Sequence, residues 1–153
     1  MISLPPGPIR RARVVLPPGP LLASATAALA PLGWPSATVQ LLGGPLARGV
    51  FTCSVLTPGG PPWIDYGPRR DLGACWFVMG SLTFGPALDG TPALHCHAML
   101  ADAEGRTHGG HIVPDATALA APGLVGWAVS TPAASFRIVR DVSTFNLLHP
   151  VAA

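Results

Sequence analysis

Proline and glycine interrupt this chain so often that long helices have little room to form. Its 153 residues include 19 prolines and 18 glycines. Proline removes a backbone hydrogen-bond donor, and glycine in the middle of a helix or strand loses more backbone entropy than any other residue. Both residues are favoured in turns. We therefore expect strands joined by turns, with few and short helices.

One segment favours a helix in spite of this punctuation. Pro20 suits the first turn, alanines are the best helix formers, and apolar residues recur at helical spacing from position 21 to position 32. Pro31 and Gly33 would end the helix. The main helix is therefore predicted over residues 20–30.

The other apolar segments are typical of strands bounded by turns. Their predicted ranges are 13–16, 37–42, 49–56, 74–84, 93–101, 106–113, 124–130 and 134–139. They predict an α+β fold with a central, mostly antiparallel β-sheet and one main helix. A single domain over residues 1–153 is expected, with a Pro-rich N-terminal arm over about residues 1–12.

Segment 57–71 is predicted to be an exposed loop. It carries Trp63, Tyr66 and the pair Arg69-Arg70, side chains that suit ligand or phosphate binding. A loop of this length is equally typical of a segment ordered by a neighbouring subunit. We favour the subunit contact.

The surface composition points to self-association and away from nucleic acid or membrane. Only 10% of the residues are charged, against ~25% in an ordinary soluble protein. Part of the uncharged surface is therefore expected to be buried between subunits. The net charge of +2 is too small to indicate a nucleic-acid binder by itself. Pro122, Gly123, Gly126 and Pro132 interrupt the most apolar stretch, so no membrane span is expected.

The start of the chain lacks the pattern of a secretory signal, so the cytoplasm is the expected location. No continuous apolar segment follows Arg10, Arg11 and Arg13, so a secretory signal is not expected. The odd number of cysteines, Cys53, Cys75 and Cys96, cannot close a full disulfide framework. Reduced, buried thiols are the expected state.

Histidines cluster in one predicted hairpin. In the segment 94–100 the residues alternate, so His95, His97 and Met99 share one face while Cys96 shares the other face with its apolar neighbours. Asp102 can start a turn and Gly105 can close a three-residue loop in the left-handed conformation. In that register His97 lies directly opposite His111, and His95 lies diagonal to it.

The register depends on the length of the turn. A two-residue turn would place His111 opposite Cys96, on the core face. The pair Gly109-Gly110 could also hold a bulge that redirects His111. By alternation His108 is expected to be a solvent or rim residue. His149 is not tied to the cluster, and Asp102 and Glu104 are expected to be turn residues.

Three imidazoles on one face are suited to a divalent metal such as zinc. Opposed Cβ atoms lie ~5 Å apart and diagonal ones ~7 Å, which lets three rings converge on one ion. Ligation by His95, His97 and His111 alone leaves an open position for water or substrate, as in catalytic zinc sites. Histidines that only hydrogen-bond across a subunit contact are an equally weighted alternative.

The segment from His95 to His111 resembles the signature of the PPC domain, the plants-and-prokaryotes-conserved domain. The matching residues are His95-x-His97-x-x-Leu100-Ala101-Asp102-x-x-Gly105 and Gly109-Gly110-His111-Ile112. Further similarity lies in residues 13–19, in Gly80-Ser81-Leu82 and in Phe145-Asn146-Leu147-Leu148. The resemblance implies a compact α+β domain assembled as a homotrimer, and a metal-capable site at His95, His97 and His111. Stand-alone prokaryotic members are described as DNA-binding candidates without a settled activity.

Two features of the plant members are missing from this sequence. It has no Arg-Gly-Arg-Pro AT-hook, so their minor-groove DNA binding does not carry over. Residues 73–78 read Gly-Ala-Cys-Trp-Phe-Val where the plant partner-docking motif is Gly-Arg-Phe-Glu-Ile-Leu. A weaker resemblance, to the first cupin motif, rests on Gly90, His95-x-His97, Asp102 and Gly109. The second cupin motif is absent from the sequence.

Two functions follow from these observations. The favoured one is a small homotrimeric binding or regulatory module that holds a ligand, a metal or DNA. For DNA, the candidate contacts are Arg10, Arg11, Arg13, Arg69 and Arg70, diluted by Asp65 and Asp71. The alternative is a zinc-dependent hydrolase that uses His95, His97 and His111, for which no general base can be identified.

Overall fold

The computed structural model describes residues 8–140 and 147–152. Most of the predicted N-terminal arm and the residues Phe145-Asn146 therefore lie outside the described residues. The helical elements are α1 (Leu21–Leu29) and a short 3-10 helix over Ala30–Leu32. The strands are β1 (Arg10–Leu16), β2 (Gly19–Pro20), β3 (Ala37–Arg48), β4 (Val50–Thr52), β5 (Ser54–Leu56), β6 (Ile64–Tyr66), β7 (Arg70–Asp71), β8 (Cys75–Pro86), β9 (Pro92–Ala101), β10 (Thr107–Ile112), β11 (Ala118–Leu119), β12 (Leu124–Ser130), β13 (Ala134–Ile138) and β14 (Leu148–Ala152).

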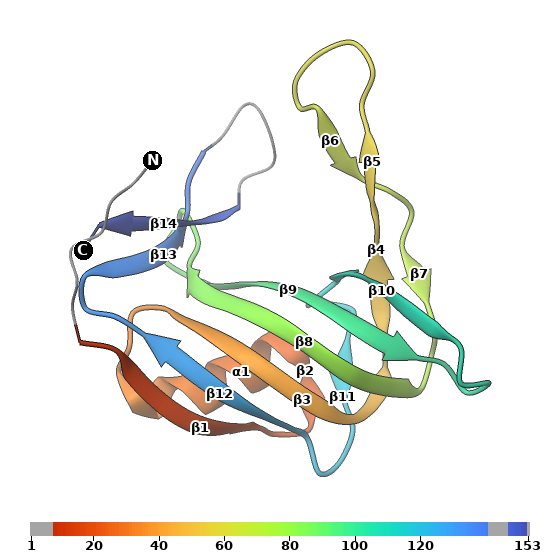
Figure 1. The fold of residues 1–153 in the computed structure, drawn as a ribbon, viewed down its shortest axis with the longest axis horizontal. Coiled ribbons are helices and arrows are strands. Elements are labelled where there is room, and N and C mark those ends of the chain that lie inside the picture. Colours follow the sequence, from red (N-terminus) through yellow and green to blue (C-terminus); the bar gives the residue numbers. More distant parts are fainter. Residues whose placement is uncertain (1–7, 141–146, 153) are drawn as a thin grey trace.

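One large antiparallel sheet dominates the molecule (Figure 1). Its main strand order is β1-β12-β3-β8-β9-β10-β4-β7, and β11 pairs with β2 and β3 beside this path. Two separate ribbons, β5–β6 and β13–β14, complete the strands. This confirms the predicted α+β class with a mostly antiparallel sheet and one main helix.

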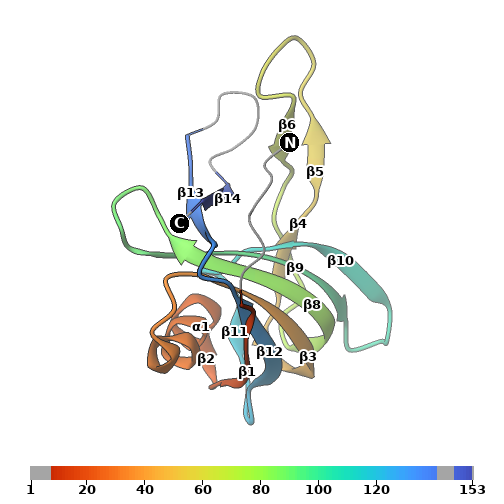
Figure 2. The same cartoon turned by 60° about the vertical axis from the view of Figure 1, so that its left-hand side comes forward.

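The core lies between the sheet and α1. Alternate residues of the central strands, such as Val39, Leu82 and Leu100, are fully or almost fully buried, and Leu21 and Ala25 of α1 belong to the same cluster. Figure 2 shows α1 on one side of the sheet. We call this side the helix face. No helix within the described residues is long and apolar enough to cross a bilayer.

The opposite side, which we call the open face, carries the other set of alternating residues. The strand pairing places Trp127 beside Gln40, Gln40 beside Ser81, and Ser81 beside His97. Directly opposed residues of antiparallel strands point to the same side. Exposed large apolar side chains belong to these strands and to the neighbouring β1: Val15, Leu42, Trp76, Met79, Met99, Trp127 and Val129.

Several boundaries differ from the sequence-based ranges for identifiable reasons. The prediction ended a strand at Leu42, but β3 continues to Arg48 through Gly43-Gly44-Pro45. At Gly44 an added Cβ would collide with the Leu124 side chain, so this glycine serves close strand packing and not a turn. The predicted strand 49–56 is two strands, β4 and β5, which belong to different sheets.

The predicted loop 57–71 is only partly a loop. It contains β6, which pairs with β5, and β7, which pairs with β4. The β5–β6 ribbon projects away from the sheet in both views (Figures 1 and 2). Leu56 and Trp63, close to its end, are 84% and 57% exposed. The return of the chain along β6 brings Tyr66 back toward the sheet.

Candidate metal centre

The loop between β9 and β10 fixes the position of every residue in the histidine hairpin. The Asp102 backbone N–H donates to the Arg106 carbonyl at 3.0 Å, and the Gly105 N–H donates to the Asp102 carbonyl at 3.0 Å. Gly105 has a φ of 78°, a conformation that residues with a side chain adopt at an energetic cost. The predicted three-residue loop is confirmed.

The Asp102 carboxylate ties this loop together. Oδ1 accepts the backbone N–H groups of Glu104 and Arg106 at 3.1 and 2.9 Å. Oδ2 lies 2.8 Å from Arg106 Nε and 2.9 Å from His108 Nε2. The hydrogen bond with His108, and then those with Arg106, holds the pKa of Asp102 far below its usual range. Asp102 is thus a turn residue, as predicted. His108 is partly exposed, which agrees with the predicted rim position, and Asp102 holds its ring.

The resulting register brings the three predicted histidines to one side of the sheet. His111 pairs directly with His97 across β10 and β9. The pairing runs without a shift through Gly109 and Gly110. These two glycines therefore do not form the bulge considered as an alternative. An added Cβ at Gly110 would collide with the Thr52 carbonyl oxygen. Glycine at this position lets β4 pair closely with β10.

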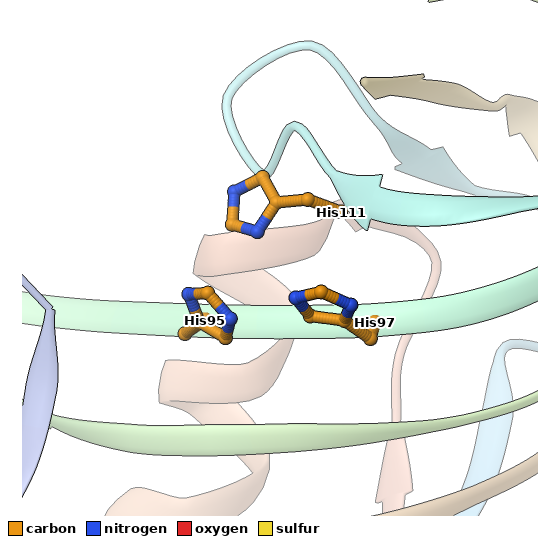
Figure 3. Close-up of side chains that lie close together, drawn as sticks. All are labelled: His95, His97 and His111. Carbon is orange, nitrogen blue, oxygen red and sulfur yellow. The ribbon is translucent and has the colours of Figure 1, made fainter. Parts of the chain in front are cut away.

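The three rings face a common space (Figure 3). Their centroids are 4.8 Å apart for His95 and His97, 4.6 Å for His95 and His111, and 5.5 Å for His97 and His111. One possible ligand nitrogen from each ring lies within 4.8 Å of the others. Among the described residues, no carboxylate or thiol joins this group.

Electrostatics favour the neutral imidazoles that metals require. Burial, followed by repulsion from His95 and His97, lowers the pKa of His111 to about 4. Burial, followed by repulsion from His97, also lowers the pKa of His95. A neutral imidazole has a free lone pair for a metal ion, so less proton competition opposes metal binding at these two residues.

The donor set fits a divalent ion. Three nitrogens bound to one zinc ion at ~2.0–2.1 Å lie ~3.3 Å apart. The ligand nitrogens here lie within 4.8 Å of one another, so an approach of about 1.5 Å or less would bring them to that spacing. His95 and His111 are partly buried and His97 is exposed. One side of the centre is therefore accessible to a ligand.

Tyr66 is a neighbour of this centre that the sequence did not reveal. Its ring stacks on His111 with centroids 4.5 Å apart and an interplanar angle of 29°. Its hydroxyl oxygen lies 3.5 Å from His111 Nδ1. Burial raises the pKa of this phenol. The only signal was that the single tyrosine of the chain lies in a segment already noted for its aromatic and basic residues.

The arginines proposed for DNA do not gather on one surface. Arg10, Arg11 and Arg13 lie on β1, whereas Arg70 lies on β7, and these strands are at opposite ends of the main sheet order. Arg70 is placed over the Phe51 ring, with its guanidinium carbon 5.9 Å from the centroid. One chain therefore offers no continuous basic surface built from these five residues.

The cysteines are free thiols, but only one is buried. Cys96 is fully buried on the helix face, and burial raises the pKa of its thiol to about 12. Cys75 is partly exposed and Cys53 is exposed. The expectation of buried thiols is therefore wrong for Cys53, which lies at the break between β4 and β5, and holds only in part for Cys75.

Comparison with known proteins identifies the fold. Neither a family model nor a curated protein sequence matches this chain. Among solved structures, a metal-containing protein from Archaeoglobus fulgidus matches with a TM-score of 0.65 and 16% identity, covering 99% of this chain and 98% of that one. A plant- and prokaryote-conserved (PPC) protein from Pyrococcus horikoshii matches with a TM-score of 0.62 and 18% identity, covering 100% and 97%.

A third structure, a "putative DNA-binding protein" from Ralstonia eutropha, has a TM-score of 0.64 and 12% identity, covering 94% of this chain and 90% of that one. These matches extend over nearly the whole chain and show that it has the PPC-domain fold. The predicted resemblance to that domain is thereby confirmed at the level of structure.

Proposed function

We propose that this protein is a small metal-binding module whose divalent cation is held by His95, His97 and His111. The observation that carries the proposal is the convergence of three imidazoles, with ligand nitrogens within 4.8 Å of one another, on one side of the sheet. The metal-containing protein from Archaeoglobus fulgidus, which has the same fold, supports it. Zinc is one of the divalent cations that suit an all-imidazole set, and it is the one we propose.

Three protein ligands leave at least one position on the metal for an external group. A bound zinc ion would act there as a Lewis acid that attracts an oxygen or nitrogen donor. The chain itself supplies the fixed geometry: β9 carries two ligands, β10 carries the third, and Asp102 fixes their relative position. Hydrolysis would need a general base beside the metal, and no carboxylate of the described residues joins the cluster. We therefore propose ligand binding or regulation as the role of the centre.

We also propose that the protein assembles as a homotrimer through the open face. Trp127 and Met79 are 53% and 52% exposed there, and Met99 lies beside the histidines on the same side of β9. Exposed apolar side chains gathered on one face are typical of subunit contacts. The low charge content of the sequence agrees with a surface that is partly covered by other copies.

Metal content tests the proposed centre. Protein purified without added zinc should carry about one divalent ion per chain, measured by elemental analysis, and His97→Ala should lose most of it because only two ligands remain. His149→Ala is the matched control, since His149 lies on β14 and outside the cluster. Equal and negligible metal in the wild type and in His97→Ala would overturn the proposal.

A further inference from the structure

A small cavity lies directly beside the proposed metal centre. Its volume is about 260 Å³, below the ~300–1,000 Å³ of sites for drug-sized ligands. His111 and Tyr66 form part of its wall, together with residues close to them in the sequence and Thr52 of β4. The full lining is Thr52, Tyr66, Gly67, Arg69, His111, Val113, Pro114 and Asp115.

His111 belongs both to the histidine cluster and to the wall of this cavity. Its ring faces His95 at 4.6 Å, and Tyr66 stacks on it at 4.5 Å. A molecule in the cavity would therefore lie next to the metal that His111 helps to hold. The phenolic oxygen of Tyr66, which also lines the cavity, lies 3.5 Å from His111 Nδ1.

Arg69 is the cationic side chain of the cavity. It is exposed and makes no ion pair with any residue that the structure describes. Its neighbour Arg70 differs, because Arg70 lies over the Phe51 ring and does not line the cavity. Guanidinium groups match carboxylate and phosphate groups through paired N–H donors.

We propose that this cavity binds a small oxyanion, with Arg69 holding the charged group and the metal at His95, His97 and His111 binding one of its oxygens. This inference rests on the proposed metal-binding function and names the ligand class of the same centre. Carboxylates and phosphates share the required chemistry. The volume limits the ligand to a small molecule or to the charged end of a larger one.

Asp115 provides a second test of the proposal, in which the expected effect is opposite to that of Arg69. Its carboxylate lines the same cavity and makes no ion pair with the described residues. A bound oxyanion is repelled by this negative charge. Removing the charge of Asp115 should therefore strengthen oxyanion binding, whereas removing the charge of Arg69 should weaken it.

Cobalt(II) provides the measurement, because its visible absorption reports both metal binding and a change of the metal's ligands. The protein is loaded with cobalt and titrated separately with glycolate and with inorganic phosphate. Ultrafiltration checks that cobalt stays with the protein. At least one of the two anions should change the spectrum to saturation, and the one that binds more tightly identifies the ligand as a carboxylate or a phosphate.

The variants separate this inference from the metal site itself. Arg69→Gln should bind cobalt like the wild type and bind the anion about ten- to a hundredfold more weakly. Asp115→Asn should bind the anion several-fold more tightly, and the matched control Arg70→Gln should equal the wild type.

If cobalt binds but neither anion changes the spectrum, or if Arg69→Gln equals the wild type, the inference fails and the metal site stands. If cobalt does not bind to the wild type, the proposed metal-binding function fails. The binding of an oxyanion by Arg69 and the metal together then fails as well.

Discussion

The two faces of the sheet are built by the same strands but from different residues. On β9, Cys96 and Leu100 point to the helix face and are fully buried. Their neighbours His97 and Met99 point to the open face and remain exposed. Contacts within the chain account for the helix face. The open face carries the three histidines and exposed apolar side chains, for which we have proposed partners outside the chain, namely an ion and other subunits.

This difference shows that alternate positions of one strand can serve different roles, one in stability and the other in binding. Residues of the helix face stabilise the fold by burial, at ~25 cal/mol per Å² of apolar surface. Residues of the open face bury less surface within the chain, so the fold should depend on them less. Substitutions at neighbouring positions of one strand should therefore have unlike consequences.

The largest effect should come from the helix face. Leu100→Ala removes a fully buried side chain and should lower the free energy of unfolding by about 2–5 kcal/mol through lost burial and a residual cavity. Met99→Ala, one position away on the open face, should change the unfolding of the isolated chain by less than about 0.5 kcal/mol. Urea unfolding at low protein concentration measures both. Equal losses would remove the distinction between the faces.

An intermediate effect should appear in assembly. Trp127→Ser removes a large side chain from the open face, and truncation of a central aromatic residue typically weakens an interface by ~2 kcal/mol or more. Light scattering should give a mass of three chains for the wild type and a lower mass for Trp127→Ser on dilution. Leu88→Ser is the matched control, since Leu88 is 55% exposed but lies in the connection between β8 and β9. A monomeric wild type would contradict the prediction.

The smallest change in stability should come from the loop between β9 and β10, which sets which residues of β10 point to each face. Asp102→Asn keeps the shape of the side chain but removes the charge that contacts His108 and Arg106. The pKa of Asp102 is lowered in the folded state, so its contribution is fully present above the unfolded pKa of ~3.9 and is lost as pH falls below it.

Chemical unfolding at a series of pH values between about 6 and about 3 measures this contribution. The variant should be less stable than the wild type at the upper end, and the difference should shrink toward the lower end. A difference that does not depend on pH would show that the charge of Asp102 is not involved.

The histidine centre could be predicted because its register is local. Asp102 and Gly105 set the loop, and the loop determines which residue faces His97. Tyr66 could not be predicted in the same way, because its contact with His111 joins positions 45 residues apart. That contact depends on the path of the β5–β6 ribbon, which glycine and proline residues had made resemble a loop.

Strand ends were predicted less well at glycines, because glycine can either form a turn or allow close packing of strands. Gly43-Gly44 is typical of a turn, but in β3 these residues let neighbouring strands approach closely. Gly105 forms a turn, as the sequence pattern predicts. Only the packing of distant strands distinguishes the two cases, and the pattern of nearby residues does not contain that information.

The three-residue loop after β9 also restricts how this chain can change over time. Replacing Ala103 or Glu104 alters an exposed surface and leaves the pairing of His97 with His111 intact. Inserting or deleting one residue there would turn the side chains of β10 over and send His111 toward the core. We therefore expect functional descendants of this sequence to vary in the composition of the loop while keeping its length.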